Sequence, residues 1–425
     1  MGDALTIVMT AIGLGLSLVL GRISVNQFHQ VKSAAEFLLV RRTLRESSGE
    51  LRRFAAWEHR SQLGAGTGVA AITKPGWILE RPLEVDRIVL NLVAAPPDPP
   101  VDPRRVLMRY WPLSNTGRRY SRYHEAVSEL DRPANWFDAA CYRMVAVRPS
   151  ATGSSLSLDL AATRYWLGFD TTEALAHEAA HVYQRTKGAK ISGPFRRKLG
   201  DPFDFERRHC PVGFVTLTVR QDGDDSTFFL MRRGSKVATG VNMTAAVPSG
   251  EFQPSDDSPF SLRRDLDLWF AVMREYAEEF LGHDEVREHR GAPIDYDHEP
   301  PFDLMQAARR QGLMRLYFLG LGVEPLTWKA QLYTVCVFEG ATFDRLFADM
   351  IQENAEGVLQ LPSLHRGLAQ PFQGWRFDEP TVRQYLDSLA LSPSSRVALR
   401  LTWRHRFILG LTGDGPSGAG ISGIE

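Results

Sequence analysis

Three glutamates close together in the chain have the spacing needed to hold a divalent cation. Glu275, Glu278 and Glu279 lie three and four residues apart, so a helix would place their carboxylates on one face. Three acids on one stripe repel one another unless a cation neutralises them, and carboxylate oxygens are ligands of hard cations such as Mg²⁺ and Mn²⁺. The opposite face of this helix is apolar, being formed by Trp269, Phe270, Met273, Ala277 and Phe280. The alternative interpretation is a solvated acidic face, which is common on surface helices.

A second pattern has the spacing of a zinc site. His177 and His181 lie four residues apart with Glu178 beside them, within a helical stretch at residues 171–185. In zinc metallopeptidases two histidines at this spacing bind the metal and the glutamate acts as general base. No extended His-x-x-Gly-x-x-His pattern follows. We therefore expect the histidine pair to pack against a neighbouring part of the chain without a bound Zn²⁺, and keep a zinc metallopeptidase as an alternative function.

Strand-like segments precede the acidic helix. Residues 212–219 alternate in polarity, 228–233 form a second such run, and 237–247 a third. The sequence Pro248-Ser249-Gly250 ends these runs, and helical periodicity extends from about 261 to 281. Strands at 316–320 and 331–338 and a helix at 342–354 follow. This order favours a sheet with helices packed on its faces.

This order of elements, together with the residues of the acidic helix, resembles the Nudix hydrolase superfamily. The box of that family is written G-x5-E-x7-R-E-U-x-E-E-x-G-U, where U is a bulky aliphatic residue. Gly250 matches its first glycine. The R-E-U-x-E-E core is matched by Arg274, Glu275, Tyr276 in the U place, Glu278 and Glu279. The resemblance covers about residues 210–360.

The resemblance implies an α/β/α sandwich and a metal-dependent hydrolase. The three helix glutamates would hold Mg²⁺ or Mn²⁺, and water would attack a nucleoside-diphosphate-linked compound. Glu275 would serve as a ligand or base, with Arg274 orienting it. Gly250 and Arg232 would lie beside the substrate, a nucleotide-like small molecule.

The box departs from the family pattern in its spacing. Gly250 and Arg274 are 24 residues apart, against 14 in the family pattern, which indicates an insertion of about ten residues. Leu266 stands in the place of the early glutamate, and the late glycine is displaced to Gly282. The second half also resembles, more loosely, the Nudix-type region behind a helix-turn-helix in actinobacterial regulators. That likeness implies an alternative function: a non-catalytic, ligand-sensing module on a Nudix fold.

The N-terminal segment is apolar enough to predict a membrane anchor. Residues 4–20 are uncharged, Asp3 precedes them, and basic residues follow them. Seventeen apolar or small residues reach the lower limit of a transmembrane helix. The basic residues after the segment place the body in the cytoplasm. We therefore expect a single-pass membrane protein with its transmembrane helix in residues 1–22; a buried hydrophobic helix is the alternative.

Composition sets the remaining limits. The chain has 425 residues with 50 Lys+Arg against 50 Asp+Glu, so no overall field draws it to nucleic acid, and no direct nucleic-acid binding is expected. Three widely spaced cysteines argue against a disulfide framework and predict buried reduced thiols.

The predicted fold class is α+β. After the N-terminal hydrophobic helix we expect an amphipathic helical stalk at 23–63, a mixed α/β region of unknown role at 64–209, the Nudix-like domain at 210–360, C-terminal helices at 361–412 and a disordered tail at 413–425.

Overall fold

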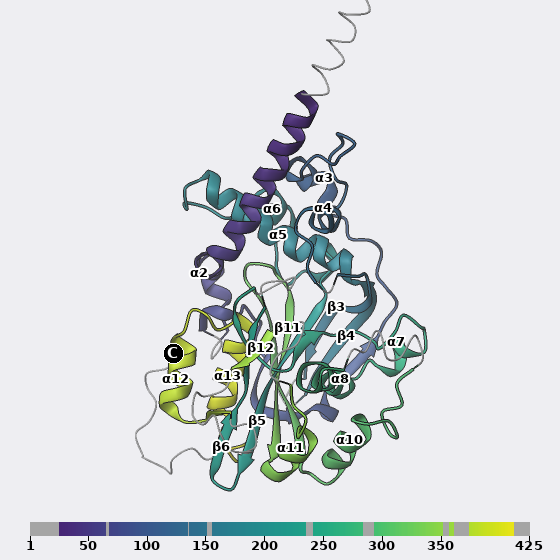
Figure 1. Ribbon diagram of the computed structural model, residues 1–425, viewed down its shortest axis with the longest axis vertical. Helices are drawn as coiled ribbons and strands as arrows, with labels where there is room; N and C mark the ends of the chain where they lie inside the picture. Colours follow the sequence, from purple (N-terminus) through teal and green to yellow (C-terminus); the bar gives the residue numbers. More distant parts are fainter. Residues whose placement is uncertain are drawn as a thin grey trace, which may run out of the picture.

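The computed structural model of the chain describes residues 25–64, 68–134, 136–150, 155–234, 241–283, 293–351, 357–360 and 374–411. This part of the chain has a mixed α+β fold, which confirms the predicted class. Helices gather at one end of the molecule and on both sides of one large sheet (Figure 1). Cys141, Cys210 and Cys336 are buried and unpaired, as predicted.

Six helices form the first end of the molecule. One covers residues 25–46, and α2 (Ser48–Glu58) follows after a break at Ser47. Three short helices lie near the long helix α5 (Tyr165–Arg185): α3 (Pro103–Leu107), α4 (Tyr123–Leu130) and α6 (Pro194–Leu199) (Figure 1). Residues of helix 25–46, α2 and α5, among them Val40, Leu51 and Ala179, share one buried cluster.

A seven-stranded sheet forms the centre of the fold. Its strand order is β1 (Ile78–Glu84), β10 (Met314–Val323), β11 (Ala330–Glu339), β5 (Val212–Asp222), β6 (Asp225–Phe228) and β13 (Trp375–Arg376), and β9 (Ser249–Glu251) pairs with β5 off this path. Strands β11 and β5 are parallel, and the other pairs are antiparallel. Because β1 pairs with β10, the sheet crosses the predicted boundary between residues 64–209 and 210–360.

Helices cover both faces of this sheet. Successive side chains of a strand point to opposite faces. One face, with Phe214 and Phe338, packs against α8 (Leu268–Leu281), where the Tyr276 ring lies 5.4 Å from that of Phe338. The other face, with Leu217 and Val335, shares a buried cluster with α13 (Pro393–Arg404). Helices α8 and α13 therefore lie on opposite sides of the sheet (Figure 1).

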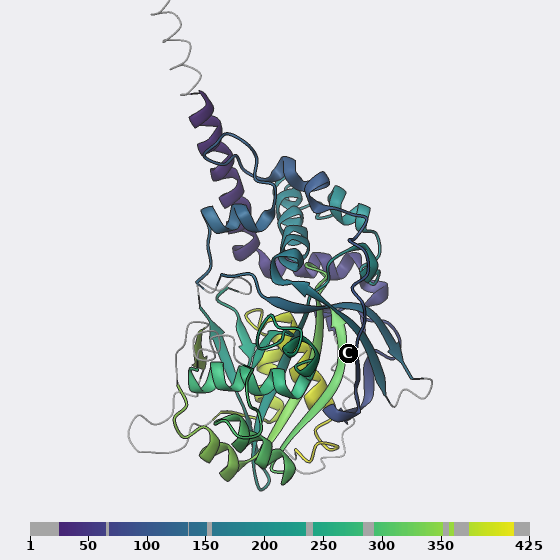
Figure 2. The same cartoon turned by 90° about the vertical axis from the view of Figure 1, so that its right-hand side faces the viewer.

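Two smaller sheets and several short elements complete the fold. One sheet has the order β2 (Val89–Leu92), β4 (Leu156–Arg164), β3 (Ala140–Pro149), and it lies between the helical end and the large sheet (Figure 2). The other has the order β12 (Gly357–Gln360), β7 (Leu230–Arg233), β8 (Thr244–Ala246). The remaining helices are α7 (Ser261–Arg264), α10 (Phe302–Arg310), α11 (Gly340–Leu346) and α12 (Glu379–Asp387), with 3-10 turns at Arg60–Gln62, Gly68–Ala70, Val85–Arg87, Met108–Tyr110 and Phe205–Arg207.

Some element boundaries differ from those predicted. The helix expected at 261–281 is two helices, because Asp265 ends α7 and Asp267 caps α8 by accepting a hydrogen bond from Trp269 N at 2.7 Å. An aspartate competes for backbone N–H groups, so it favours helix starts over helix interiors. Within the described residues the strand expected at 237–247 is limited to β8, and the helix expected at 342–354 ends at Leu346.

The expectation of a single-pass membrane protein is wrong for the described residues, since none of their helices is long and apolar enough to cross a bilayer. These helices bury one face against the protein and carry charges on the rest, as helix 25–46 does with Lys32, Glu36 and Arg42. The segment expected to span the membrane, residues 4–20, lies outside the described residues, as do 361–373 of the C-terminal region and the tail at 413–425.

Candidate functional site

Helix α8 carries the predicted acidic stripe on a well-defined frame. It begins at the Asp267 cap and ends at Gly282, whose φ of 73° is left-handed. The N–H of Gly282 donates to Glu278 O and that of His283 to Ala277 O, which closes the last turn. The displaced glycine of the box is thus the residue that ends the helix, and its φ suits a residue without Cβ.

The three glutamates of α8 lie beside strand β9. Glu279 is buried with 1% of its surface exposed, whereas Glu275 and Glu278 are half-buried. The N–H of Ser249 donates to Glu279 Oε1 at 3.4 Å. Gly250 contacts Glu275 so closely that a Cβ at position 250 would overlap its carboxylate. The structure therefore brings together the first glycine of the predicted box and its acidic helix.

Arg274 ties α8 to the insertion that precedes it. The guanidinium is buried and donates to Tyr296 Oη and to Gln253 O, both at 2.5 Å, and lies 3.8 Å from Asp265 Oδ2. Asp265 is fully buried and also accepts from the N–H of Ser255 at 2.8 Å. These contacts hold the insertion against α8. The expected role of Arg274, orienting Glu275, stays a prediction.

Arg232 lies apart from this group. It is exposed on β7, in the sheet formed with β12 and β8. None of the contacts found within the described ranges joins its side chain to α8. Its expected position beside the substrate therefore also stays a prediction.

The donor chemistry of the α8–β9 site fits a hard cation, although its geometry is incomplete. Among the described residues no group of three or more His, Cys, Asp or Glu side chains is arranged to hold a metal ion. Mg²⁺ is usually bound through one or two carboxylates and keeps waters or substrate phosphates as its other ligands. Glu275 and Glu278 are half-buried, and the backbone of Gly250 lies against the carboxylate of Glu275. These two carboxylates meet the requirement for Mg²⁺ ligands.

The glutamate of the zinc-like pattern serves a different purpose. Glu178 is 1% exposed, and its two oxygens accept the N–H groups of Phe195 at 2.7 Å and Arg196 at 2.9 Å, at the start of α6. Burial raises the pKa of Glu178, while these two N–H groups act in the opposite direction. A Cβ at Gly193 would overlap the carboxylate, so this contact depends on a glycine there. Both oxygens of the carboxylate therefore act in capping α6.

The two histidines pack among aromatic rings. His177 lies 4.8 Å from the Phe37 ring and 5.2 Å from the Tyr123 ring, and the ring of His181 lies 4.7 Å from that of Tyr110. Burial, and then the positive charge of Arg41, lower the pKa of His177 well below its ordinary value. A cation beside His177 also disfavours a second cation there. The Nε2 atoms of both histidines are buried without a hydrogen-bond partner in the described part of the chain.

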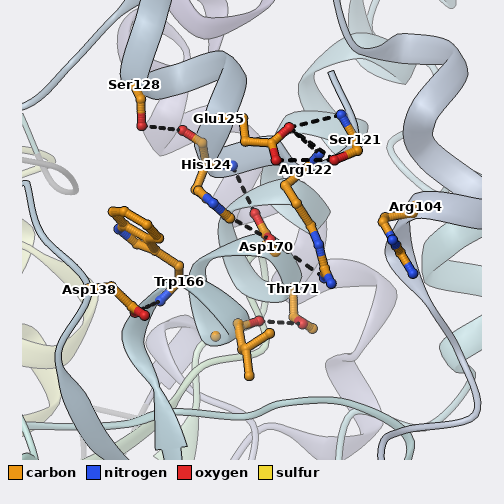
Figure 3. Close-up of polar contacts among 12 residues, drawn as sticks. Arg104, Ser121, Arg122, His124, Glu125, Ser128, Asp138, Trp166, Asp170 and Thr171 are labelled. Atoms are coloured by element: carbon orange, nitrogen blue, oxygen red, sulfur yellow. Dashed lines mark hydrogen bonds and ion pairs between the residues drawn. The ribbon is translucent and has the colours of Figure 1, made fainter. Parts of the chain in front are cut away.

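Sequence reasoning missed a buried ion-pair cluster beside α5. Asp170 is 2% exposed and accepts from the N–H of His124 at 2.8 Å and from His124 Nδ1 at 2.9 Å, with Arg122 3.9 Å away (Figure 3). The His124 ring stacks on Trp166 at 4.5 Å. Asp170 precedes His177 by seven residues, so it lies on the same helical stripe, and this spacing was the available signal. Among the described residues no hydroxyl or thiol bonds to His124 Nε2, so the cluster ties α4 to α5 and lacks a nucleophile.

No protein-family model and no curated protein matches this chain. The candidate site therefore stands on its own residues and their geometry.

Proposed function

We propose that the α8–β9 site binds a divalent cation and hydrolyses the diphosphate of a nucleotide-like compound, as Nudix hydrolases do. The observation that carries the proposal is the contact of Gly250 with the carboxylate of Glu275. This contact spans the insertion and joins the two parts of the predicted box. The helices α8 and α13 on opposite faces of the sheet also agree with the α/β/α sandwich that the resemblance implies.

Two side chains of the site hold the cation in this proposal, and one of them, Glu275, is also the base. Glu275 and Glu278, which reach solvent, hold the cation, while Glu279 is fixed by Ser249 N–H and adds negative charge behind them. Bound Mg²⁺ or Mn²⁺ supplies charge neutralisation at the phosphate oxygens and lowers the pKa of water. Glu275, held against the β9 backbone, accepts the proton of the attacking water.

Glu278→Gln and Glu279→Gln test the proposal, because each keeps the size of the side chain and removes its charge. In the full chain, Mg²⁺ or Mn²⁺ should raise the melting temperature by binding the folded state. Both variants should lose most of this rise, and hydrolysis across a panel of nucleoside-diphosphate conjugates should fall by about 100-fold or more. Glu379→Gln, the same change at an exposed position of α12, should alter neither quantity.

Two outcomes would contradict the proposal in different ways. Equal stabilisation of the wild type and both variants by metal would show that the glutamates form only a solvated face. Stabilisation that depends on the glutamates, without turnover of any conjugate, would favour the ligand-sensing module.

A further inference from the structure

A small cavity with a partly polar lining lies in the helical end, away from α8. It is formed by helix 25–46, α2, α5, the loop between β10 and β11 and the residues Val241 and Met243 before β8, and its volume is about 50 Å³. Its polar lining consists of Arg41, Arg45, Ser48, Arg52, Glu173 and Thr327. A single water needs about 10–15 Å³ by this measure, so the cavity holds about three to five water-sized groups. A tetrahedral oxyanion, with four oxygens, has this size.

The three arginines have more donors than partners. Arg41 is 6% exposed, and its Nε and Nη1 donate to Asp131 Oδ2 at 2.6 Å and to Tyr123 Oη at 3.1 Å. Arg45 donates once, to the same Asp131 oxygen at 2.6 Å. A guanidinium carries five N–H donors, so both arginines, which line the cavity, have donors beyond those used in these contacts.

Arg52, on α2, also has more N–H donors than hydrogen-bond partners. Its Nη1 contacts Met243 Sδ at 3.5 Å, and its Nε lies 3.5 Å from Glu324 Oε1. That Nε is buried and forms no hydrogen bond within the described residues. Glu324 already accepts two hydrogen bonds from Thr327 through its other oxygen. A ligand oxygen in the cavity would give the Arg52 guanidinium a better partner than the thioether sulfur.

Glu173 faces the same cavity from α5. In the described part of the chain its carboxyl group forms no hydrogen bond and no ion pair, although it lines a space with three arginines. Burial raises the pKa of Glu173, while Arg41, Lys329 and Arg52 act in the opposite direction. The side chain of Glu173 is half-buried, and a hydrogen-bonding group in the cavity can share a proton with its carboxyl group.

We propose that this cavity binds a small tetrahedral oxyanion of the phosphate class, with one proton shared between the ligand and Glu173. The arginine N–H groups bind the oxygens of the anion, as guanidinium forks commonly do. Glu173 accepts the ligand O–H, which monohydrogen phosphate carries and sulfate lacks at neutral pH. The three arginines balance the charges of Asp131, Glu324 and an ionised Glu173, so the ligand O–H is what allows Glu173 to lie beside an anion. This inference is independent of the function proposed for α8.

Calorimetric titration of the full chain with inorganic phosphate, in a low-salt buffer with EDTA, tests the site without metal at α8. We expect saturable binding of one phosphate per chain at pH 7.5, and sulfate should bind at least ten-fold more weakly. Glycerol phosphate is the second probe. Binding as tight as that of phosphate assigns the site to a phosphate monoester, and much weaker binding assigns it to the free ion.

Single-residue variants test where phosphate binds, and the circular dichroism spectrum tests whether the Glu173 variant is folded. Arg45→Gln and Arg52→Gln should each weaken phosphate binding by at least ten-fold, whereas Arg53→Gln, at an exposed position outside the cavity lining, should not. Glu173→Gln should remove the preference for phosphate over sulfate while the circular dichroism spectrum stays unchanged. No phosphate binding at millimolar concentration, or an equal loss in the Arg53 variant, would overturn the proposal.

Discussion

Two backbone N–H groups at the start of α6 each bind one oxygen of Glu178. The first turn of a helix has unsatisfied N–H groups and a partial positive charge, so a carboxylate there is stabilising. Gly193 leaves the space that this carboxylate occupies. At the scale of single residues, a glutamate between two histidines is thus explained by its neighbours in space, without a metal ion.

Glu178→Ala tests that explanation. The change removes both acceptors of the α6 cap, and the free energy of unfolding should fall by about 1–3 kcal/mol in urea denaturation. Glu178→Gln keeps one acceptor and should lose less. Zinc measured by elemental analysis should stay far below one per chain in the wild type. One tightly held zinc per chain, lost in His177→Ala, would contradict this and favour the metallopeptidase alternative.

At the scale of elements, one hydroxyl pair fixes how α8 sits on the sheet. Tyr276 is fully buried, and its Oη lies 2.7 Å from Thr218 Oγ1 on β5. Thr218 Oγ1 also donates to Val247 O at 2.6 Å. Because Tyr276 points to the sheet, its neighbour Glu275 is turned toward β9. The orientation of the acidic stripe therefore depends on a contact inside the core.

A double-mutant cycle measures this contact. Thr218→Val removes one of the two side-chain partners of Tyr276 Oη, the other being Cys336, and leaves Val247 O without its donor. It should cost about 1–3 kcal/mol of unfolding free energy, and Tyr276→Phe about 1 kcal/mol. The double variant removes both hydroxyls of the pair, so its loss should be smaller than the sum of the two single losses by about 0.5 kcal/mol or more. Urea denaturation of the four proteins gives this coupling energy. Strictly additive losses would show that the two hydroxyls do not interact.

The sequence patterns of adjacent residues predicted the helices and strands better than the contacts between distant side chains. The spacing of the glutamates and of the opposite apolar residues predicted α8, because helical periodicity is a property of adjacent residues. By contrast, Arg274 donates hydrogen bonds to Gln253 and Tyr296, each more than twenty residues away. Asp170 and His124 are 46 residues apart. Periodicity contains no information on which distant backbone approaches a side chain, and so the helix cap of Glu178 and the buried cluster were missed.

At the scale of the whole molecule, the two halves of the chain share one sheet. Strand β1 pairs with β10, with Leu83 opposite Phe318. The small sheet of β2, β4 and β3 is also joined to the second half, since the N–H of Tyr142 donates to Phe252 O at 3.0 Å and that of Met144 to Cys210 O at 2.9 Å. The acidic helix therefore rests on a core to which both halves contribute.

A fragment of residues 210–411 should therefore not fold independently, although it contains the whole region that resembles Nudix hydrolases. It would lose β1 and the buried side chains of Trp77, Leu79 and Leu83, each worth about 1.5–3 kcal/mol. That loss is comparable with the total stability of a typical domain, about 5–15 kcal/mol. The open edge of β10 would also be free to pair with other chains. Size-exclusion chromatography should show aggregates of this fragment, whereas the fragment 25–411, which keeps β1 and the helical end, should be monomeric and unfold cooperatively in urea. A monomeric 210–411 fragment with the same unfolding midpoint as the longer one would show that β1 is dispensable.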